Sequence, residues 1–301
     1  MQIVQERGND EVAKLYIAKL RDYYIEFVES KYPHLPREEK WVIVISCLLG
    51  CPVQCLMCDA GNSYHGKLSK EEMLEQIDHL VDRHFPSRII PVKKFKIQFT
   101  RMGEPAFNEA VLDLLEELPV RYQAPGLIPS VSTVGPKNAQ DFFERLIQIK
   151  KKLYEGGHFQ MQFSIHTTDA QKRDQLIPTP KMSFKEIAEF GERFFTPGDR
   201  KITLNFIVMK GYPIDPQVLA QFFHPDRFIL KFTPLNPTAR AQEKGLINIL
   251  QSHTQEAKVQ TLLDECHALG FETIVSIGEL EENSIGSNCG QYVSSLVSEK
   301  S

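Results

Sequence analysis

The chain has 301 residues, 42% of them hydrophobic and 25% charged, and 35 Lys and Arg against 39 Asp and Glu give a formal net charge of -4. This composition is typical of a globular protein, and no apolar run is long enough to predict a membrane span. The first ten residues lack the features of a secretory signal, so we expect a cytoplasmic protein. Because proteins that bind large folded nucleic acids generally carry a basic surface, the net charge argues against RNA as a partner.

The N-terminal region is predicted to be helical. Within residues 9–31 the apolar side chains recur at three-to-four spacing, and Asn9 or Asp10 is placed to cap a helix. Pro33 and Pro36 would end it. The apolar run from Trp41 to Ile45 then predicts a strand that leads directly into a cysteine-rich loop.

Helical and strand patterns alternate through the rest of the chain. Two capping boxes, at Ser69 with Glu72 and at Ser183 with Glu186, mark helix starts. The predicted helices cover residues 69–85, 109–118, 138–154, 183–194, a short stretch after Pro216, and 256–269. The predicted strands cover 95–99, 128–132, 159–165, 202–208, 228–232 and 272–277.

Repeated strand-helix units with apolar strands predict an α/β fold with parallel pairing and helices packed outside. Six units and an extra strand fit a partial (β/α)6 barrel better than a closed eight-unit barrel. We expect an N-terminal helical extension (1–40), the partial barrel (41–280) and a C-terminal extension or tail that carries Cys289 (281–301). In such barrels the chemistry lies at the carboxyl ends of the strands.

The cysteine loop is the strongest chemical signal. Cys51, Cys55 and Cys58 have the spacing C-x3-C-x2-C, in a run bracketed by Gly50, Pro52 and Gly61. Three such thiolates can each bind one iron of a four-iron four-sulfur cluster, which leaves the fourth iron open to a small molecule. A zinc site would need a fourth ligand, for which His65 is the nearest candidate. A disulfide framework fits poorly with six cysteines in a cytosolic chain of this length.

Six short motifs in order resemble those of one family. They are G-C-x3-C-x2-C, M-G-E-P-x-x-N from Met102, S-T-x-G from Ser132, S-I-H from Ser164 followed by K-R-D-Q-L-I-P, P-L-N-P from Pro234, and C-G-Q from Cys289. Together they resemble the RlmN/Cfr family of radical S-adenosylmethionine (SAM) adenosine methyltransferases, which act on ribosomal and transfer RNA. The resemblance runs from about residue 37 to residue 293.

The resemblance implies two cofactors, a 4Fe-4S cluster and SAM, and a role for each matched residue. Cys51, Cys55 and Cys58 would bind the cluster, and Gly103 and Glu104 would meet the amino end of SAM. Cys289 would match the cysteine that carries the methyl group, and Glu29 would match a glutamate proposed as proton acceptor. The ribose and adenine of SAM would be lined by Ser132, Ser164, Ile165, His166 and Asn236. An electron donor such as flavodoxin or ferredoxin would reduce the cluster.

Three departures from the family bear on the substrate. The family has a resolving cysteine seven residues before the first cluster cysteine, where this chain has Val44, and Cys47 is not equivalent to it. The family's N-terminal RNA-binding module is replaced by one predicted helix, and the net charge is negative. We therefore predict a methyltransferase that uses Cys289 on a non-ribosomal substrate, a small molecule or a peptide rather than RNA.

Three alternatives stay open at this point. The first is a radical SAM oxidoreductase, cyclase or epimerase without methyl transfer. The second is an RNA adenosine methyltransferase. The third is a non-catalytic protein that binds zinc or a structural cluster, and metal analysis would distinguish it from the others.

Overall fold

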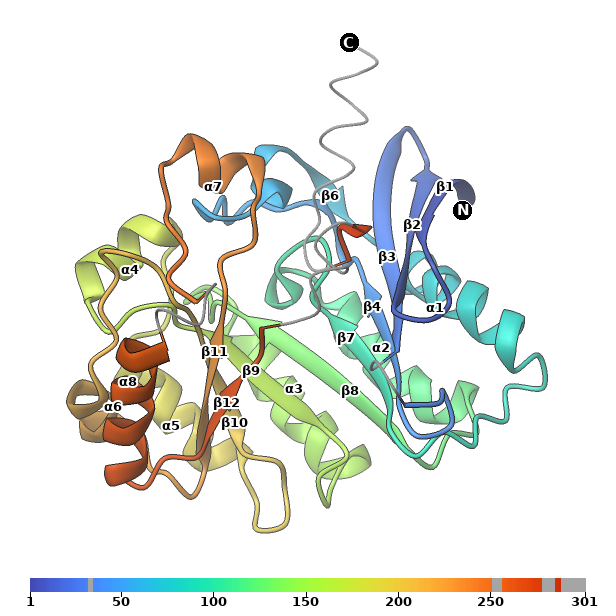
Figure 1. The fold of residues 1–301 in the computed structure, drawn as a ribbon. Coiled ribbons are helices and arrows are strands. Elements are labelled where there is room, and N and C mark those ends of the chain that lie inside the picture. The colour runs from blue at the N-terminus through green and yellow to red at the C-terminus, as the bar shows by residue number, and fades with distance from the viewer. Residues whose placement is uncertain (32–34, 251–255, 278–284, 288–301) are drawn as a thin grey trace.

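The structure, a computed structural model, describes residues 1–31, 35–250, 256–277 and 285–287. Its described part is built on one ten-stranded sheet, in the order β1-β2-β3-β4-β7-β8-β9-β10-β11-β12 (Figure 1). The first four strands pair antiparallel, and from β4 to β12 each strand is parallel to its neighbour. The strands are β1 (Gln2–Gly8), β2 (Ala13–Leu20), β3 (Tyr23–Lys31), β4 (Trp41–Ile45), β7 (Phe95–Phe99), β8 (Leu127–Thr133), β9 (Gln160–Ser164), β10 (Ile202–Ile207), β11 (Phe228–Thr233) and β12 (Thr273–Val275).

Helices cover one face of this sheet (Figure 1), and two cavities open on the other face. The covering helices are α1 (Lys70–His84), α2 (Ala110–Arg121), α3 (Gln140–Leu153), α5 (Phe184–Phe194), α6 (Pro216–Phe222) and α8 (Glu256–Ala268). Both predicted capping boxes are formed, at Ser69 and at Ser183. The expectation of a mixed α/β fold with a large parallel sheet is therefore confirmed. Among the described residues, no helix is long and apolar enough to cross a membrane.

The predicted N-terminal helix is wrong, because residues 13–20 and 23–31 form the β2–β3 hairpin. The hairpin is apolar on both faces: one packs on α1 and the sheet core, the other on a small cluster of Ala13, Leu15, Val28 and Ile285. A strand buried on both faces loses its period-two alternation, so its apolar residues also match a helical spacing. The turn is two residues, Arg21 and Asp22, and Arg21 has a positive φ of 55°.

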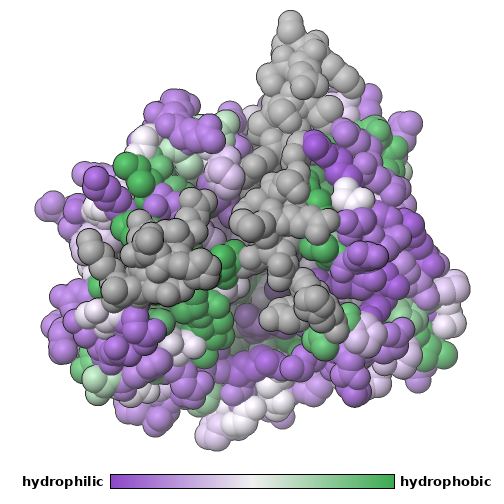
Figure 2. Space-filling view, viewed as in Figure 1, coloured by the Kyte–Doolittle hydropathy of each residue, from purple (hydrophilic) through white to green (hydrophobic). Residues whose placement is uncertain are grey.

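The two faces of the parallel strands differ in polarity. In β4, β7, β9 and β11 fully buried residues alternate with half-buried ones. The fully buried set is apolar and packs against the helices, as Ile43, Ile97 and Phe163 do. The other set is mostly polar and faces the concave side, where hydrophilic residues line a hollow (Figure 2). This polar concave face is where a ligand can bind.

Shorter elements at the carboxyl ends of the strands position the cysteine loop. A two-stranded sheet pairs β5 (Leu48–Gly50) with β6 (Tyr64–Lys67). The remaining elements at this edge, which the sequence patterns did not predict, are the short helices η1 (Asp59–Asn62), η2 (Pro105–Phe107), α4 (Ala170–Leu176) and α7 (Ala239–Glu243).

Candidate functional site

The cysteine loop leaves β5 at the carboxyl edge of the sheet. Gly50 begins it with a φ of 79°, and a Cβ there would lie 1.8 Å from the carbonyl oxygen of Ser63, so only glycine fits. The backbone N–H of Cys51 donates to the same carbonyl at 3.0 Å. The positive φ of Gly50 and the hydrogen bond from Cys51 to Ser63 turn the chain sharply where the cysteine loop begins.

Residues from the far end of the chain hold this loop. The carboxylate of Asp59 accepts the backbone N–H groups of Ala239 and Arg240 at 3.1 and 2.9 Å, at the start of α7. The Thr238 hydroxyl donates to the carbonyl of Met57 at 3.0 Å. Arg240 Nη2 donates to the carbonyl of Gln54 at 3.1 Å. The cysteine loop and α7 therefore form one unit, although about 180 residues of sequence separate them.

The three thiols fit an iron-sulfur cluster by their environment. Burial raises the pKa of the Cys51 thiol to about 11, partly offset by backbone hydrogen bonds from Val53, Glu104 and Gln54. Burial also raises the pKa of Cys55, with the neighbouring Cys51 as the next cause. A cluster would bind the thiolates and lower these pKa values, and backbone N–H donors to sulfur stabilise such thiolates.

The arrangement differs from a site for one ion. Among the described residues, no group of three or more His, Cys, Asp or Glu side chains is arranged to hold a single metal ion. A cluster takes three protein thiolates on three different irons, so it does not require the three sulfur atoms to converge on one point.

Gly103 and Glu104 follow β7, close to the cysteine loop. Gly103 has a φ of 102°, and a Cβ there would meet the Leu48 side chain at 2.5 Å. Glu104 is buried, and its carboxylate accepts the N–H groups of Ala106 and Val134 at 3.0 and 2.9 Å and the hydroxyl of Thr133. Burial raises the pKa of Glu104 to about 7, against the effect of these hydrogen bonds. The carboxylate thus has a fixed orientation between β7 and β8.

The remaining predicted cofactor-binding residues lie at the same edge. Ser132 is the penultimate residue of β8 and Ser164 the last of β9, while Ile165 and His166 donate their backbone N–H groups to the carbonyl of Asn205 in β10. His166 is buried with a φ of 66°, and its Nδ1 accepts the N–H of Ile207 at 3.2 Å. Burial lowers the pKa of His166 to about 3, so the ring is neutral at pH 7.

A cavity of about 350 Å³ opens on the concave face beside these strand ends, and we call it the upper cavity. Its lining includes two cations, Arg101 and Lys231, and four hydrogen-bonding amide side chains: Gln98, Gln162, Asn205 and the predicted Asn236. The Oδ1 atom of Asn205 is buried and has no hydrogen-bond partner among the described residues. An unpaired buried acceptor of this kind would be satisfied by an N–H donor of a ligand.

The structure does not bring Glu29 to this cavity. In β3 the neighbours Val28 and Ser30 face the concave side, so Glu29 faces the helices. There one carboxylate oxygen lies 2.8 Å from Arg37, 2.8 Å from His84 and 3.1 Å from the indole nitrogen of Trp41. Cys289 lies outside the described residues.

Val44 and Cys47 differ in where they lie. Val44, at the position of the family's resolving cysteine, lines the upper cavity. Cys47 is buried in the main core, and its Sγ donates to the carbonyl of Met102. Cys47 therefore does not take the place of a thiol at position 44.

Sequence reasoning missed a buried ion pair at the rim of the upper cavity. Arg101, at the end of β7, pairs with Glu26 of β3, and their side chains are only 2% and 0% exposed. The same guanidinium donates to the carbonyls of Gly286 and Ser287, each at 2.7 Å. Arg101 directly precedes the Met-Gly-Glu-Pro motif. The pair with Glu26 could not be predicted, because residues 23–31 form a strand where the sequence pattern predicted a helix.

A second buried cation was also missed. Arg173, in α4, donates to the carbonyl of Met182 at 2.7 Å, while its Nε and Nη2 atoms have no hydrogen-bond partner among the described residues. Burial lowers its pKa to about 10. A ligand carboxylate would satisfy these atoms.

Comparison with known proteins places this site in context. No family model matches the chain. A protein of Ectopseudomonas mendocina (strain ymp) named "Probable RNA methyltransferase" is 33% identical over 207 residues, 68% of this chain and 53% of that protein. A "Probable dual-specificity RNA methyltransferase RlmN" of Thermus thermophilus is 25% identical over 267 residues, 86% of this chain and 69% of that protein. The chain thus spans about half to two thirds of the length of these relatives.

A solved structure has a similar fold. It is the crystal structure of a radical SAM methyltransferase from Sphaerobacter thermophilus, with a TM-score of 0.72 and 20% sequence identity over 96% of this chain and 80% of the other. The chain resembles the RlmN/Cfr family of radical SAM methyltransferases. That resemblance implies a 4Fe-4S cluster and SAM as cofactors.

The relatives contradict one prediction. We expected a small molecule or a peptide to be the substrate in preference to RNA, whereas the relatives are named RNA methyltransferases. The prediction rested on Val44, on the single predicted N-terminal helix and on the net charge of the whole chain. The helix is a β-hairpin, and the net charge does not describe any one surface. Binding depends on the local field of one surface, which can be basic on a protein whose total charge is negative.

Proposed function

We propose that this protein is a radical SAM enzyme that methylates RNA, with a sheet curved as the partial barrel of that superfamily. The observation that carries the proposal is the convergence of three elements at one edge of the sheet. These are the cysteine loop after β5, the Gly103-Glu104 turn after β7 and the amide-lined upper cavity. The carboxyl ends of parallel strands are where such folds place their chemistry.

Different residues would bind the two cofactors, the 4Fe-4S cluster and SAM. Cys51, Cys55 and Cys58 would hold the cluster, and SAM bound at its open iron would supply the 5′-deoxyadenosyl radical. Glu104, held by Thr133 and Val134, would orient toward the amino group of SAM. Glycine at position 103 permits the positive φ of this turn and its close packing against Leu48.

The strand ends would bind the nucleoside part of SAM. Ser132, Ser164 and Asn236 offer hydroxyl and amide groups for the ribose and adenine, and Ile165, whose side chain is buried in the main core, would contribute its backbone. His166 would take part as a neutral ring, because burial keeps it uncharged, with its proton on Nε2 when Nδ1 accepts from Ile207. A neutral imidazole can donate a hydrogen bond without adding charge near the sulfonium of SAM.

Cys289 would carry the methyl group on its way to RNA. The described segment that leads to it, residues 285–287, is held by Arg101 through the two carbonyl hydrogen bonds and by Ile285 in the cluster with Ala13. These contacts hold residues 285–287 against β2 and the loop after β7. Glu29 has no part in the proposed mechanism, because it faces the helices.

The first test is cofactor content. After anaerobic reconstitution we expect about four irons and four sulfides per chain, as for this type of cluster. The Cys51→Ser variant should lose them, and the control Cys266→Ala, in α8, should keep them. A single zinc per chain would refute the cluster.

The second test follows the methyl group. The reconstituted protein is incubated with a reductant, methyl-deuterated SAM and RNA, and Cys289 and the RNA are examined by mass spectrometry. Label on Cys289 and on adenosine of the RNA would support the proposal. Formation of 5′-deoxyadenosine with no label on either would instead favour a radical enzyme without methyl transfer, as Val44 at the cavity wall suggests.

A further inference from the structure

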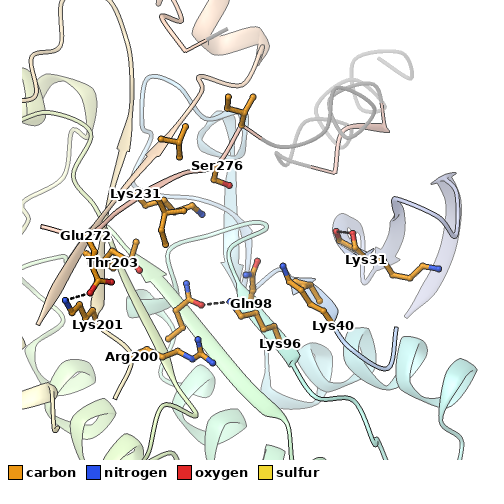
Figure 3. Close-up of a pocket in the computed structure, with 17 residues that line it drawn as sticks. Lys31, Lys40, Lys96, Gln98, Arg200, Lys201, Thr203, Lys231, Glu272 and Ser276 are labelled. Atoms are coloured by element: carbon orange, nitrogen blue, oxygen red, sulfur yellow. Dashed lines mark hydrogen bonds and ion pairs between the residues drawn. The ribbon is translucent and has the colours of Figure 1, made fainter. Parts of the chain in front are cut away.

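A larger cavity, of about 760 Å³, lies on the concave face toward the amino ends of the parallel strands, and we call it the lower cavity. Among the described residues its charged lining is mostly basic: one side chain is acidic, Glu272, and six are basic, Lys31, Lys40, Lys96, Arg200, Lys201 and Lys231. Figure 3 shows them around one hollow, with Lys31 and Lys40 on the side of the N-terminal strands and Lys201 and Lys231 on the side of the last strands.

The one carboxylate does not balance these cations. Lys201 pairs with Glu272 at 2.7 Å, so the charge of Glu272 is already used. Lys96 Nζ donates to the neutral Oε1 of Gln160 at 2.5 Å, and Arg200 Nε donates to the carbonyl of Gly157 at 2.7 Å. The lining therefore keeps an excess of positive charge on a partly enclosed surface.

The cations are close enough to repel one another. The pKa of Lys96 is lowered to about 8, mainly by burial and in addition by the nearby cations Lys40, Arg200 and Lys231. Burial is also the main cause that lowers the pKa of Lys231, followed by Lys40. The lysines of this lining are partly buried and Arg200 is exposed. Like charges gathered in one cavity repel one another, and a bound anion would offset that repulsion.

The two cavities form one continuous surface. They share six lining residues, among them Gln98 of β7 and Lys231 of β11. Along this surface the lining changes from one rich in amides beside the cysteine loop to one rich in cations further away. Amides that can hydrogen-bond a base, followed by cations that can bind phosphate, match the two halves of a nucleotide.

We propose that the lower cavity binds the phosphates that flank the target nucleoside of a single-stranded RNA segment, while the target base lies against Gln98, where the two cavities meet, next to the SAM nucleoside at Asn236. The inference rests on the proposed function, since it assumes an RNA substrate. To the proposed function it adds which part of the RNA the protein binds, the phosphates, and which residues bind them, chiefly Lys96 and Lys231. The local positive field also accounts for RNA binding by a chain whose net charge is -4.

The test measures RNA binding apart from catalysis. A fluorescein-labelled single-stranded RNA of about ten nucleotides, within the usual site sizes, is titrated with wild type and with the double variant Lys96→Gln, Lys231→Gln. The control Lys151→Gln, Lys152→Gln removes the same charge from exposed positions in α3. We expect at least a tenfold loss of affinity in the first double variant and none in the control.

Salt dependence gives a second readout that misfolding would not produce. Each phosphate contact to a single strand contributes a slope of about -0.7 in log K against log salt concentration. Losing two contacts should therefore make the slope shallower by about 1.4. Circular dichroism of each variant checks that the fold is kept.

The outcomes separate this inference from the proposed function. If wild type binds and methylates RNA and the Lys96, Lys231 variant keeps its affinity and slope, the inference is overturned and the proposed function stands. If wild type neither binds nor methylates RNA, the proposed function fails and the inference with it. Pyrophosphate binding that the two substitutions abolish, with RNA binding unaffected, would identify a small-anion site and also overturn the inference.

Discussion

Replacing Arg101 by Met should destabilise the protein strongly. The change leaves the Glu26 carboxylate buried without its cation and frees the carbonyls of Gly286 and Ser287. Both side chains of the pair are almost fully buried, at 2% and 0% exposure. Removing one partner of such a pair costs about 3–5 kcal/mol, a large share of the roughly 5–15 kcal/mol by which a typical protein is stable.

An exposed pair supplies the matched control for this substitution. Arg193 lies 2.7 and 2.8 Å from the carboxylate oxygens of Glu144, with side chains 53% and 51% exposed. Arg193→Met removes the same groups but should cost less than about 1 kcal/mol, because water replaces the lost partner. Urea unfolding followed by circular dichroism gives the free energy of unfolding of each variant.

A double variant identifies the cause of the loss. Glu26→Leu combined with Arg101→Met removes both charges, so it should be more stable than Arg101→Met alone. The reasoning is refuted if Arg101→Met and Arg193→Met differ by less than about 1 kcal/mol, since the burial of the pair would then have no energetic effect. Loss of methyl label on Cys289 in the less drastic Arg101→Lys would further support a role in positioning the segment at 285–287.

Three further predictions concern Lys96, Gly103 and Asp59. The pKa of Lys96 is lowered from 10.5 to about 8, so its charged form destabilises the fold by about 3 kcal/mol below pH 8, and this cost disappears as pH rises to 10.5. Lys96→Gln should therefore raise the free energy of unfolding at pH 7 but not at pH 10.5, and equal effects at both would contradict the reasoning. Gly103→Ala should cost at least about 1 kcal/mol more than Gly66→Ala, because both have positive φ but only position 103 meets a side chain, that of Leu48. Asp59→Ala releases the N–H groups at the start of α7, so a chelator should remove iron faster than from wild type, and an unchanged rate would show that α7 does not hold the loop.

Local sequence signals determined most of the α/β part of the fold. The strands at Trp41–Ile45 and Phe95–Phe99 match their predicted bounds, and both serine capping boxes formed where the spacing indicated. These signals are local: an apolar run or a cap acts on its own few residues, so a sequence pattern can reveal it. The position of the cysteine loop beyond a strand could be predicted for the same reason.

The N-terminal strands could not be predicted, because their partners decide their structure. Tyr16 and Leu15 are adjacent in sequence and fully buried on opposite faces of the hairpin, Tyr16 against α1 and Leu15 against Ile285. Burial on both faces removes the alternation that distinguishes a strand from a helix. The orientation of Glu29 could not be predicted either, because it follows from the register of a strand that was not predicted. That register assigns Glu29 to the helix-covered face.

The cysteine spacing and the order of the short motifs in the sequence were enough to indicate the resemblance to radical SAM methyltransferases. Only the tertiary structure decided which charges meet. Glu26 and Arg101 are 75 residues apart, and the basic lining of the lower cavity comes from strands spread between residues 31 and 231. Net charge sums over the whole surface, whereas binding depends on the field where the chain folds its cations together. The negative net charge of the chain therefore gave no indication of the basic cavity, which forms when distant parts of the chain come together in the fold.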